Sequence, residues 1–379
     1  MKKRILAVLI ATALAVSVTG CAGNATSSSD STSASSVAES SDTSTQTSAD
    51  ASSEDESKDE SSQEESKDLE ANYTKYTLDG DLTQHMIDMS RLNEGNKVRL
   101  ANVIKKLKNG EEVTVGFIGG SITQGTSAGN DLCYAKLTAD WLQKTYSNAK
   151  INYVNAGIGA TGSYIGVHRV ANDLLSKNPD LVFVEFSVND TTENTERNKK
   201  SYDGLLRTIW KSSTNPAIIT IATTQEDGTS FQDQHAEIVK HYDLPMISYR
   251  NTILDTIKHG DIVWKDISDD NIHPNVPGHK IVSQLLQAYI SDVDKDVDNI
   301  SGSESDFTTP ATDAPIENGS LIQPSSATDV TATGAFGNYE QQFGGFDGFW
   351  LFKGTSDADI SATSVSYTHL RAHETSAHL

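Results

Sequence analysis

The sequence has little cysteine and few basic residues for its length. Only two of its 379 residues are cysteines, Cys21 and Cys133, so a framework of several disulfides is excluded. Thirty Lys and Arg stand against 52 Asp and Glu, and the formal net charge of −22 leaves no basic footprint for nucleic acid. Hydrophobic residues make up only 36%, which indicates that part of the chain does not pack into a core.

The apolar run near the N-terminus is short. Residues 5–18 are apolar, too few for a comfortable membrane span, and they follow three basic residues at 2–4, as in an export signal. The run ends in Val-Thr-Gly-Cys21, which resembles a bacterial lipobox. We therefore expect residues 1–21 to be a lipoprotein signal and Cys21 to carry lipid, anchoring an exported protein on the extracellular side of the membrane. An ordinary secretory signal with a chance cysteine is the alternative. A lipidated Cys21 cannot pair with Cys133, which we expect to be a buried thiol.

Regions of low complexity flank the middle of the chain. Residues 22–72 are acidic and Ser-rich with almost no large apolar side chains, so we expect a disordered linker there. Residues 294–334 are again rich in Ser, Thr, Asp and Pro and predict a second linker. Aromatic residues and glycines in 335–365 predict the start of a truncated β-rich module, too short to fold alone. Residues 366–379 look like a translated sequencing-adapter read, which predicts a non-native tail; a metal-binding tail is the alternative.

Short apolar runs alternate with helical periodicity between residues 73 and 293, which we expect to form one catalytic domain. The runs are rich in Val, Ile and Phe, as in strands that are buried on both faces. Strands separated by helices predict an α/β fold in which a five-stranded parallel sheet lies between two helical layers and ligands bind at the carboxyl ends of the strands. The expected strands are 113–118, 151–154, 181–186, 217–222 and 245–248, and the expected helices are 82–109, 131–146, 163–177, 196–212, 231–242 and 277–291.

The first segment with chemical potential follows the first expected strand. Residues 119–125 read GGSITQG and place Ser121 where a strand ends and a helix begins. Glycines there allow close backbone approach, and a helix N-terminus would stabilise developing negative charge. A phosphate-cradling turn is the alternative.

The second segment, residues 155–162, reads NAGIGATG and contains the pattern G-x-G-x-x-G. With Glu185 about one strand later, it allows a dinucleotide site as a rival interpretation. Against this, the dinucleotide pattern belongs to the first strand–helix turn, whereas this one follows the second expected strand, and Glu185 lies within a strand.

Two further segments carry an amide and a possible acid–base pair. Asn189, after the third expected strand, can present its amide to an oxyanion, or it can simply cap a helix. Asp270 and His273 lie three residues apart in a loop, so the carboxylate can hold the imidazole tautomer. Alternatively, His273 is a surface histidine in an acidic loop without a catalytic role. Metal ligation by Asp269, Asp270, His273 and His279 is another alternative, although the spacing matches no common metal motif.

These four segments, in this order, resemble the SGNH/GDSL hydrolase family over residues 112–292. The resemblance implies a flavodoxin-like three-layer α/β/α fold and ester hydrolysis without metal or cofactor. It identifies Ser121 with the family's nucleophile, Asn189 with its side-chain oxyanion donor, and Asp270 and His273 with its D-x-x-H-P pair.

The sequence departs from the family pattern at two places. Gly120 stands where the family's name has Asp, and we do not expect this to affect the triad. The family's oxyanion glycine falls at Ala160, with Gly159 adjacent. A backbone N–H can serve from either residue, so both stay candidates for the oxyanion hole, together with the N–H of Ser121.

The expected function is that of a serine esterase acting on O-acyl, chiefly O-acetyl, esters of extracellular polysaccharides or oligosaccharides. This expectation rests on the surface tether and on the lack of a long apolar lid segment, as a lipase would have. A lysophospholipase or thioesterase with the same residues is one alternative. A non-catalytic, glycan-binding surface lipoprotein is another.

Overall fold

The computed structural model describes residues 73–191, 194–317 and 319, together with four short strands between 330 and 364. The predicted signal, the lipid site at Cys21, the linker 22–72 and the tail 366–379 lie outside the described residues. In the described part, no helix is both long and apolar enough to cross a bilayer. Cys133 is buried and free, at the start of a helix.

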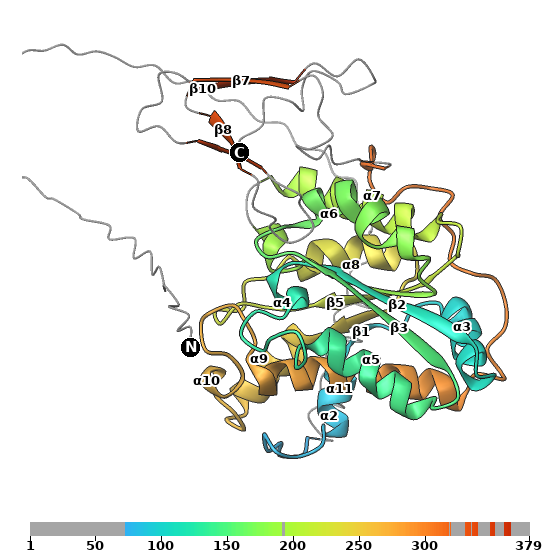
Figure 1. Ribbon diagram of the computed structural model, residues 1–379. Helices are drawn as coiled ribbons and strands as arrows, with labels where there is room; N and C mark the ends of the chain where they lie inside the picture. The colour runs from blue at the N-terminus through green and yellow to red at the C-terminus, as the bar shows by residue number, and fades with distance from the viewer. Residues whose placement is uncertain are drawn as a thin grey trace, which may run out of the picture. The chain divides into compact units, whose positions relative to one another are not determined.

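A six-stranded sheet forms the centre of the domain, with strand order β1-β6-β5-β4-β2-β3 (Figure 1). Five of the strands, β2 to β6, pair in parallel. When these five are counted from one in chain order, they lie across the sheet in the order 2-1-3-4-5, which is that of flavodoxin-like folds. The sixth strand, β1, is short and pairs antiparallel with β6 at the sheet edge. The strands are β1 (Arg91–Asn93), β2 (Glu112–Gly119), β3 (Lys150–Gly157), β4 (Leu181–Glu185), β5 (Ala217–Ala222) and β6 (Met246–Ser248).

Helices cover both faces of this sheet, which makes a three-layer α/β/α domain (Figure 1). Helices α3, α5, α9 and α11 lie on one face, and α6, α7 and α8 lie on the other. The helices are α2 (Gln84–Ser90), α3 (Val98–Lys108), α4 (Ser121–Gln124), α5 (Tyr134–Thr145), α6 (Ser163–Asp173), α7 (Thr195–Trp210), α8 (Gln232–His241), α9 (Tyr249–Lys258), α10 (Trp264–Ile267) and α11 (Val276–Lys295).

The two central strands are buried along their whole length. Every residue of β4 and of β5 is buried, because each strand faces a helical layer on both sides. Phe117 of β2 stacks on Phe183 of β4 with ring centroids 4.6 Å apart. Full burial of one such side chain contributes about 1.5–3 kcal/mol, so this core holds the strand ends, where the loops begin, in fixed positions.

The prediction of a helix over residues 82–109 is wrong for residues 91–97, between α2 and α3. The structure has α2, the strand β1 and then α3. Gly95 interrupts the helical pattern with φ +60, and a side chain there would overlap the backbone of Leu244 and Pro245. Before it, Arg91 and Asn93 pair with β6. Helical spacing in the sequence therefore came from two short helices that flank an edge strand.

The linker predicted from residue 294 is also wrong for its first part. Residues up to 317 lie against the domain, and Phe307 is only 6% exposed. Its ring stacks on Trp210 at 4.5 Å and on Tyr242 at 3.9 Å. Arg207 donates to the carbonyl of Phe307 and pairs with Glu317. This segment is therefore a packed part of the domain, held by one aromatic anchor and by ion pairs.

Four short strands lie further along the chain. The strand β7 (Val330–Gly334) pairs antiparallel with β10 (Ile360–Ser364). The strand β8 (Phe336–Tyr339) pairs antiparallel with β9 (Phe349–Phe352). Strand structure thus begins at Val330, inside the predicted linker and before the expected start of the β-rich module at 335.

Candidate active site

Ser121 is the first residue of α4, directly after the end of β2. Gly120 precedes it as the helix cap, and Gly125, with φ +101, ends this single turn in the left-handed region. The Ser121 Oγ lies 2.8 Å from the Nε2 of His273, although 152 residues separate the two in sequence. The strand end therefore presents a half-buried hydroxyl to an imidazole from a distant loop.

The loop that carries His273 is held by its own side chains. Asp270 accepts the backbone N–H groups of Ile272 at 2.7 Å and His273 at 2.6 Å through Oδ1. Its Oδ2 lies 2.7 Å from Nδ1 of His273. The hydroxyl of Ser268 donates to the carbonyls of Asp270 and His273, and the indole of Trp264 also donates to the Asp270 carbonyl. One carboxylate thus sets both the turn and the direction of the imidazole.

The charge of Asp270 is stabilised by the same contacts. Partial burial raises the pKa of its carboxyl, but hydrogen bonds from the His273 side chain and from the N–H groups of His273 and Ile272 outweigh burial and hold that pKa below its usual value of 3.8. A carboxylate facing Nδ1 favours the tautomer with the proton on Nδ1. Nε2 is then free to accept the proton of the serine hydroxyl.

Asn189 lies beside the residue that precedes the serine. It follows β4 at the start of a short 3-10 helix (Asn189–Thr191). A Cβ added to Gly120 would overlap the carboxamide oxygen of Asn189. The absence of a side chain at position 120 is therefore what admits the Asn189 carboxamide to this position.

The two candidate backbone donors after β3 differ in the structure. The N–H of Gly159 donates to Oε1 of Gln124 at 2.9 Å. Ala160 has φ +59, in the left-handed region that glycine favours. A Cβ on Gly159 would lie 3.8 Å from that of Ser121, so this loop borders the serine. Because Gln124 already engages Gly159, Ala160 is the better candidate for an oxyanion donor. Gln124 belongs to the serine segment, but no local sequence signal points to this bond.

Asp190 has a structural role that the sequence did not reveal. Its Oδ1 accepts the N–H of Ser163 at the start of α6, and its Oδ2 lies 2.9 Å from Nε2 of His235. Both Asp190 and His235 are buried. The neighbour of Asn189 therefore connects three segments beneath the site and contributes to its rigidity.

The structure does not assemble Asp269, Asp270, His273 and His279, the alternative set of metal ligands. His279 is buried, its Nδ1 accepts the N–H of Tyr134, and burial lowers its pKa to about 4, so it stays neutral. Asp269 is exposed and faces Asn275. In the described part of the chain, these four residues do not come together as a group that could hold an ion.

Glu185 also argues against the dinucleotide alternative. It ends β4, is completely buried, and its Oε1 accepts hydrogen bonds from Ser187 and Thr223. Its side chain therefore cannot reach the ribose of a nucleotide. Burial raises the pKa of this carboxyl.

This raised pKa gives a testable dependence of stability on pH. The folded protein keeps the Glu185 proton at pH values where the unfolded chain has lost it. The free energy of unfolding should therefore fall as the pH rises from the usual value of 4.5 to the raised pKa. Glu185→Gln should remove this decline, whereas the exposed Glu226→Gln should keep it. Urea unfolding at a series of pH values measures it, and an equal decline in both variants would contradict the explanation.

A polar cavity lies along β3 and the serine segment. It has a volume of about 290 Å³ and is lined by Gln124, Asn130, Tyr153, Asn155 and Gly157. Gln124 belongs to α4, which begins at Ser121, and Gly157 is the last residue of β3. This volume is near the lower limit of ordinary ligand sites, and the lining offers amides and a phenol.

Comparisons with known proteins agree with this geometry. The GDSL-like lipase/acylhydrolase family matches residues 117–281. A solved structure of a two-domain esterase active on acetylated mannans is 36% identical, with a TM-score of 0.63, and the match covers 68% of each chain. The same kind of esterase co-crystallised with mannopentaose is 35% identical, with a TM-score of 0.62, over 68% of this chain and 67% of that one. The search of the curated proteins found no match.

Proposed function

This chain belongs to the GDSL-like lipase/acylhydrolase family and is an ester hydrolase, and from that premise we propose that it removes O-acetyl groups from extracellular polysaccharides through an acyl-enzyme on Ser121. The observation that carries the proposal is the continuous contact from Ser121 Oγ to His273 Nε2, at 2.8 Å, and from His273 Nδ1 to Asp270, at 2.7 Å. Hydroxyl, imidazole and carboxylate in this order are the parts of an activated serine.

The proposed reaction runs in two halves. His273 takes the proton of Ser121 as Oγ attacks the ester carbonyl, and Asp270 stabilises the imidazolium that forms. The C–O bond of the ester breaks, the alcohol leaves with the proton from His273, and the acyl group stays on Oγ. Water, deprotonated by His273, then releases the acid. The N–H groups of Ser121 and Ala160 and the amide of Asn189 stabilise the negative oxygen in both halves.

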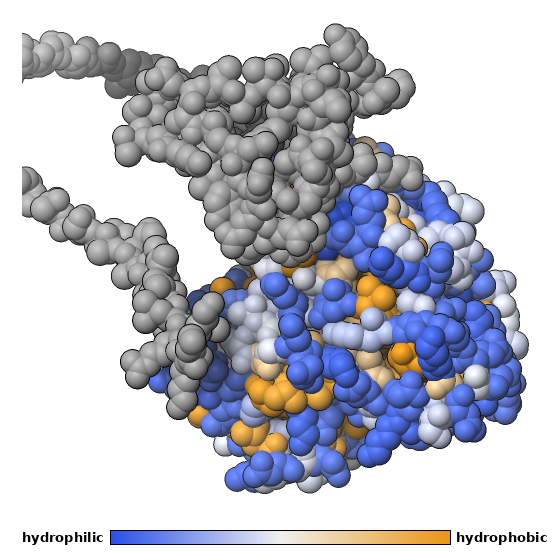
Figure 2. Space-filling view, in the orientation of Figure 1, coloured by the Kyte–Doolittle hydropathy of each residue, from blue (hydrophilic) through white to orange (hydrophobic). Residues whose placement is uncertain are grey.

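Surface chemistry supports a short acyl group. The large hydrophobic residues that are exposed in the described part are Leu132, Val263 and Val276. On the face drawn in Figure 2, hydrophobic side chains lie in separate patches among hydrophilic ones. A long acyl chain needs a continuous apolar surface, whereas the cavity beside α4 is lined by amides and a phenol that can form hydrogen bonds with a sugar. The similar two-domain esterase acts on acetylated mannans.

Acetate release tests the substrate class. The purified protein should release acetate from acetylated mannan and xylan oligosaccharides and should prefer p-nitrophenyl acetate to long-chain p-nitrophenyl esters. The Ser121→Ala variant is the blank for each substrate. Preference for long chains or for lysophospholipid would favour the lysophospholipase or thioesterase alternative. Glycan binding without hydrolysis of any ester would favour the binding-protein alternative.

Lipid attachment is a separate proposal. We propose that Cys21 carries the lipid that holds this exported protein at the cell surface, on the pattern of residues 18–21. Cys21→Ser should abolish incorporation of labelled fatty acid and release the protein from the membrane fraction. Unchanged labelling in this variant would contradict the proposal.

Gly120→Ala tests the position of the Asn189 amide. The added Cβ would displace the carboxamide oxygen, and with it the proposed oxyanion donor. Because loss of one such donor typically costs about 10²–10³ in rate, we expect kcat to fall by roughly 10²-fold with little change in KM. Steady-state kinetics on p-nitrophenyl acetate measure this effect. Asn189→Ala is the companion variant, since it removes the same amide without adding a Cβ at position 120, and it should lower kcat to a similar extent. An unchanged kcat in Gly120→Ala would remove Asn189 from the mechanism.

A further inference from the structure

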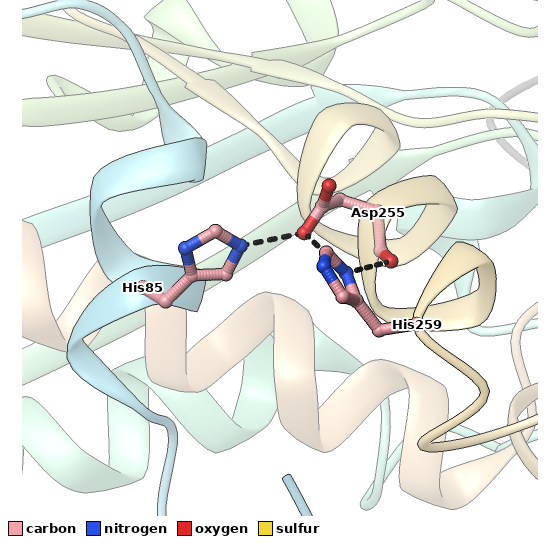
Figure 3. Close-up of side chains that lie close together, drawn as sticks. All are labelled: His85, Asp255 and His259. Atoms are coloured by element: carbon pink, nitrogen blue, oxygen red, sulfur yellow. Dashed lines mark hydrogen bonds and ion pairs between the residues drawn. The ribbon is translucent and has the colours of Figure 1, made fainter. Parts of the chain in front are cut away.

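Two imidazoles and a carboxylate meet between α2 and α9, outside the serine site (Figure 3). The Nε2 of His85 lies 2.6 Å from Oδ2 of Asp255, and Nδ1 of His259 lies 3.3 Å from the same oxygen. One potential ligand atom from each residue lies within 4.8 Å of the other two. The set shares no residue with the proposed ester-hydrolysing site.

The fold assembles this group from two facing elements. Asp255 and His259 are four residues apart at the end of α9, so their side chains lie on one face of that helix. His85 comes from the first turn of α2. The two helices are joined independently, because the hydroxyl of Thr252 in α9 donates to the carbonyl of Met86 in α2. The three ligand atoms are thus brought together by packing that does not depend on them.

The donor set suits a borderline divalent cation. Zinc takes imidazole nitrogens and carboxylate oxygens at about 2.0–2.2 Å, which separates ligand atoms in a tetrahedral site by about 3.4 Å. The separation of 3.3 Å matches this value, the separation of 2.6 Å is that of a hydrogen bond, and no pair of ligand atoms is more than 4.8 Å apart, so side-chain shifts of about 1 Å would admit an ion. The Nδ1 of His259 also lies 3.0 Å from the carbonyl of Asp255, and coordination would replace that hydrogen bond.

The surroundings limit access by bulk water and add negative charge. The side chains of His85, Asp255 and His259 are 4%, 11% and 17% exposed. The ring of Tyr73 stacks on His259 with centroids 4.1 Å apart, and its hydroxyl donates to Asp261. A second carboxylate therefore lies close to the group, and a divalent cation would compensate the charge of the two acids.

We propose that His85, Asp255 and His259 form a divalent metal site, with zinc as the ion that fits best. Three protein ligands leave a fourth position for water. The site would fasten residues 73–90, which begin the described domain, to the end of α9. Its role is to stabilise the domain where the chain enters it, and it does not depend on the ester-hydrolysing activity.

Zinc titration of the full chain tests this proposal. Calorimetry is done on metal-stripped protein in which His369, His373 and His378 are replaced by alanine, so that these histidines do not compete. One zinc ion should bind per chain. His259→Ala should weaken binding by more than about 100-fold, since even residues that only orient a ligand contribute roughly 10–100-fold. The exposed His241→Ala should leave affinity unchanged, because His241 ends α8, where it contacts the carbonyl of Thr309 and the ring of Tyr242 and is not part of the three-residue group.

Two further variants make the outcome decisive. Asp255→Asn serves if His259→Ala fails to fold, and it should also lose zinc binding. His273→Ala should bind zinc normally, which separates this site from the serine site. Cobalt should give visible absorption typical of a four-coordinate site in the parent and not in His259→Ala. Absence of zinc binding, or equal binding in His259→Ala and His241→Ala, would show that the three residues form only a hydrogen-bonded cluster.

Discussion

Replacing Ser121 by alanine is expected to lower kcat/KM for acetyl esters by roughly 10⁴–10⁶, with the domain still folded. The variant keeps the imidazole and the proposed oxyanion donors but lacks the oxygen that forms the acyl-enzyme. What remains is the weaker catalysis that binding and oxyanion stabilisation give to attack by water. Initial rates on p-nitrophenyl acetate measure the loss, and thermal unfolding shows whether the fold is intact.

Stability cannot explain a loss of this size. Ser121 is half-buried, and the substitution removes its 2.8 Å hydrogen bond to His273, which is worth about 0.5–1.5 kcal/mol. Ser147→Ala is the matched control, since Ser147 is an exposed serine in the turn after α5. Mass spectrometry after fluorophosphonate labelling should find the label on Ser121 alone. Full turnover by Ser121→Ala, or labelling of a different serine, would refute the assignment.

The parallel strands were predictable because their environment is simple. A strand that faces helices on both sides needs apolar residues at nearly every position, and 217–222 accordingly forms β5 over the predicted range. The edge strand β1 lacked such a signal. It has three residues, Arg91 to Asn93, and only its pairing with β6, more than 150 residues away, makes it a strand. Local pattern cannot report a partner that distant.

The packed segment after α11 escaped prediction for a related reason. Residues 300–317 are polar in composition, which is also typical of linkers. Their order comes from Phe307, which fills the space beside Trp210 and Tyr242, and from Glu317, which pairs with Arg207. A single aromatic anchor and an ion pair with a buried arginine are tertiary features, and composition averaged over forty residues hides them.

The meeting of the site residues followed from topology, whereas their detailed bonding did not. Ser121 and Asn189 each follow a parallel strand, and the carboxyl ends of such strands share one edge of the sheet. The sequence could not decide whether Gly159 or Ala160 is the backbone oxyanion donor. That choice depends on the side-chain position of Gln124, whose amide oxygen accepts the Gly159 N–H. Likewise, Asn189 needs a glycine at position 120 because a Cβ there would overlap its carboxamide, and this overlap between distant residues is visible only in the structure.

Replacing Asp270 by asparagine should lower kcat by roughly 10³–10⁴ while its loop keeps its shape. The asparagine oxygen can still accept the N–H groups of Ile272 and His273 that now bond to Oδ1. Its amide nitrogen, however, would face Nδ1 with a proton in place of an acceptor, which favours the tautomer whose Nε2 carries the hydrogen. Such an imidazole cannot take the proton of Ser121. Steady-state kinetics on p-nitrophenyl acetate measure the effect.

Asp269→Asn provides the matched control. Asp269 is the exposed neighbour of Asp270, and its replacement removes the same charge from the same loop. It should leave kcat unchanged, so that an effect of charge alone on the loop is excluded. The wild-type Asp270 carboxyl has a pKa below 3.8, and its contribution to stability is present above that value and lost as the pH falls through the lowered pKa. Asp270→Asn should lack this acid-side loss. Equal activity in Asp270→Asn and Asp269→Asn would mean that His273 acts without an orienting carboxylate.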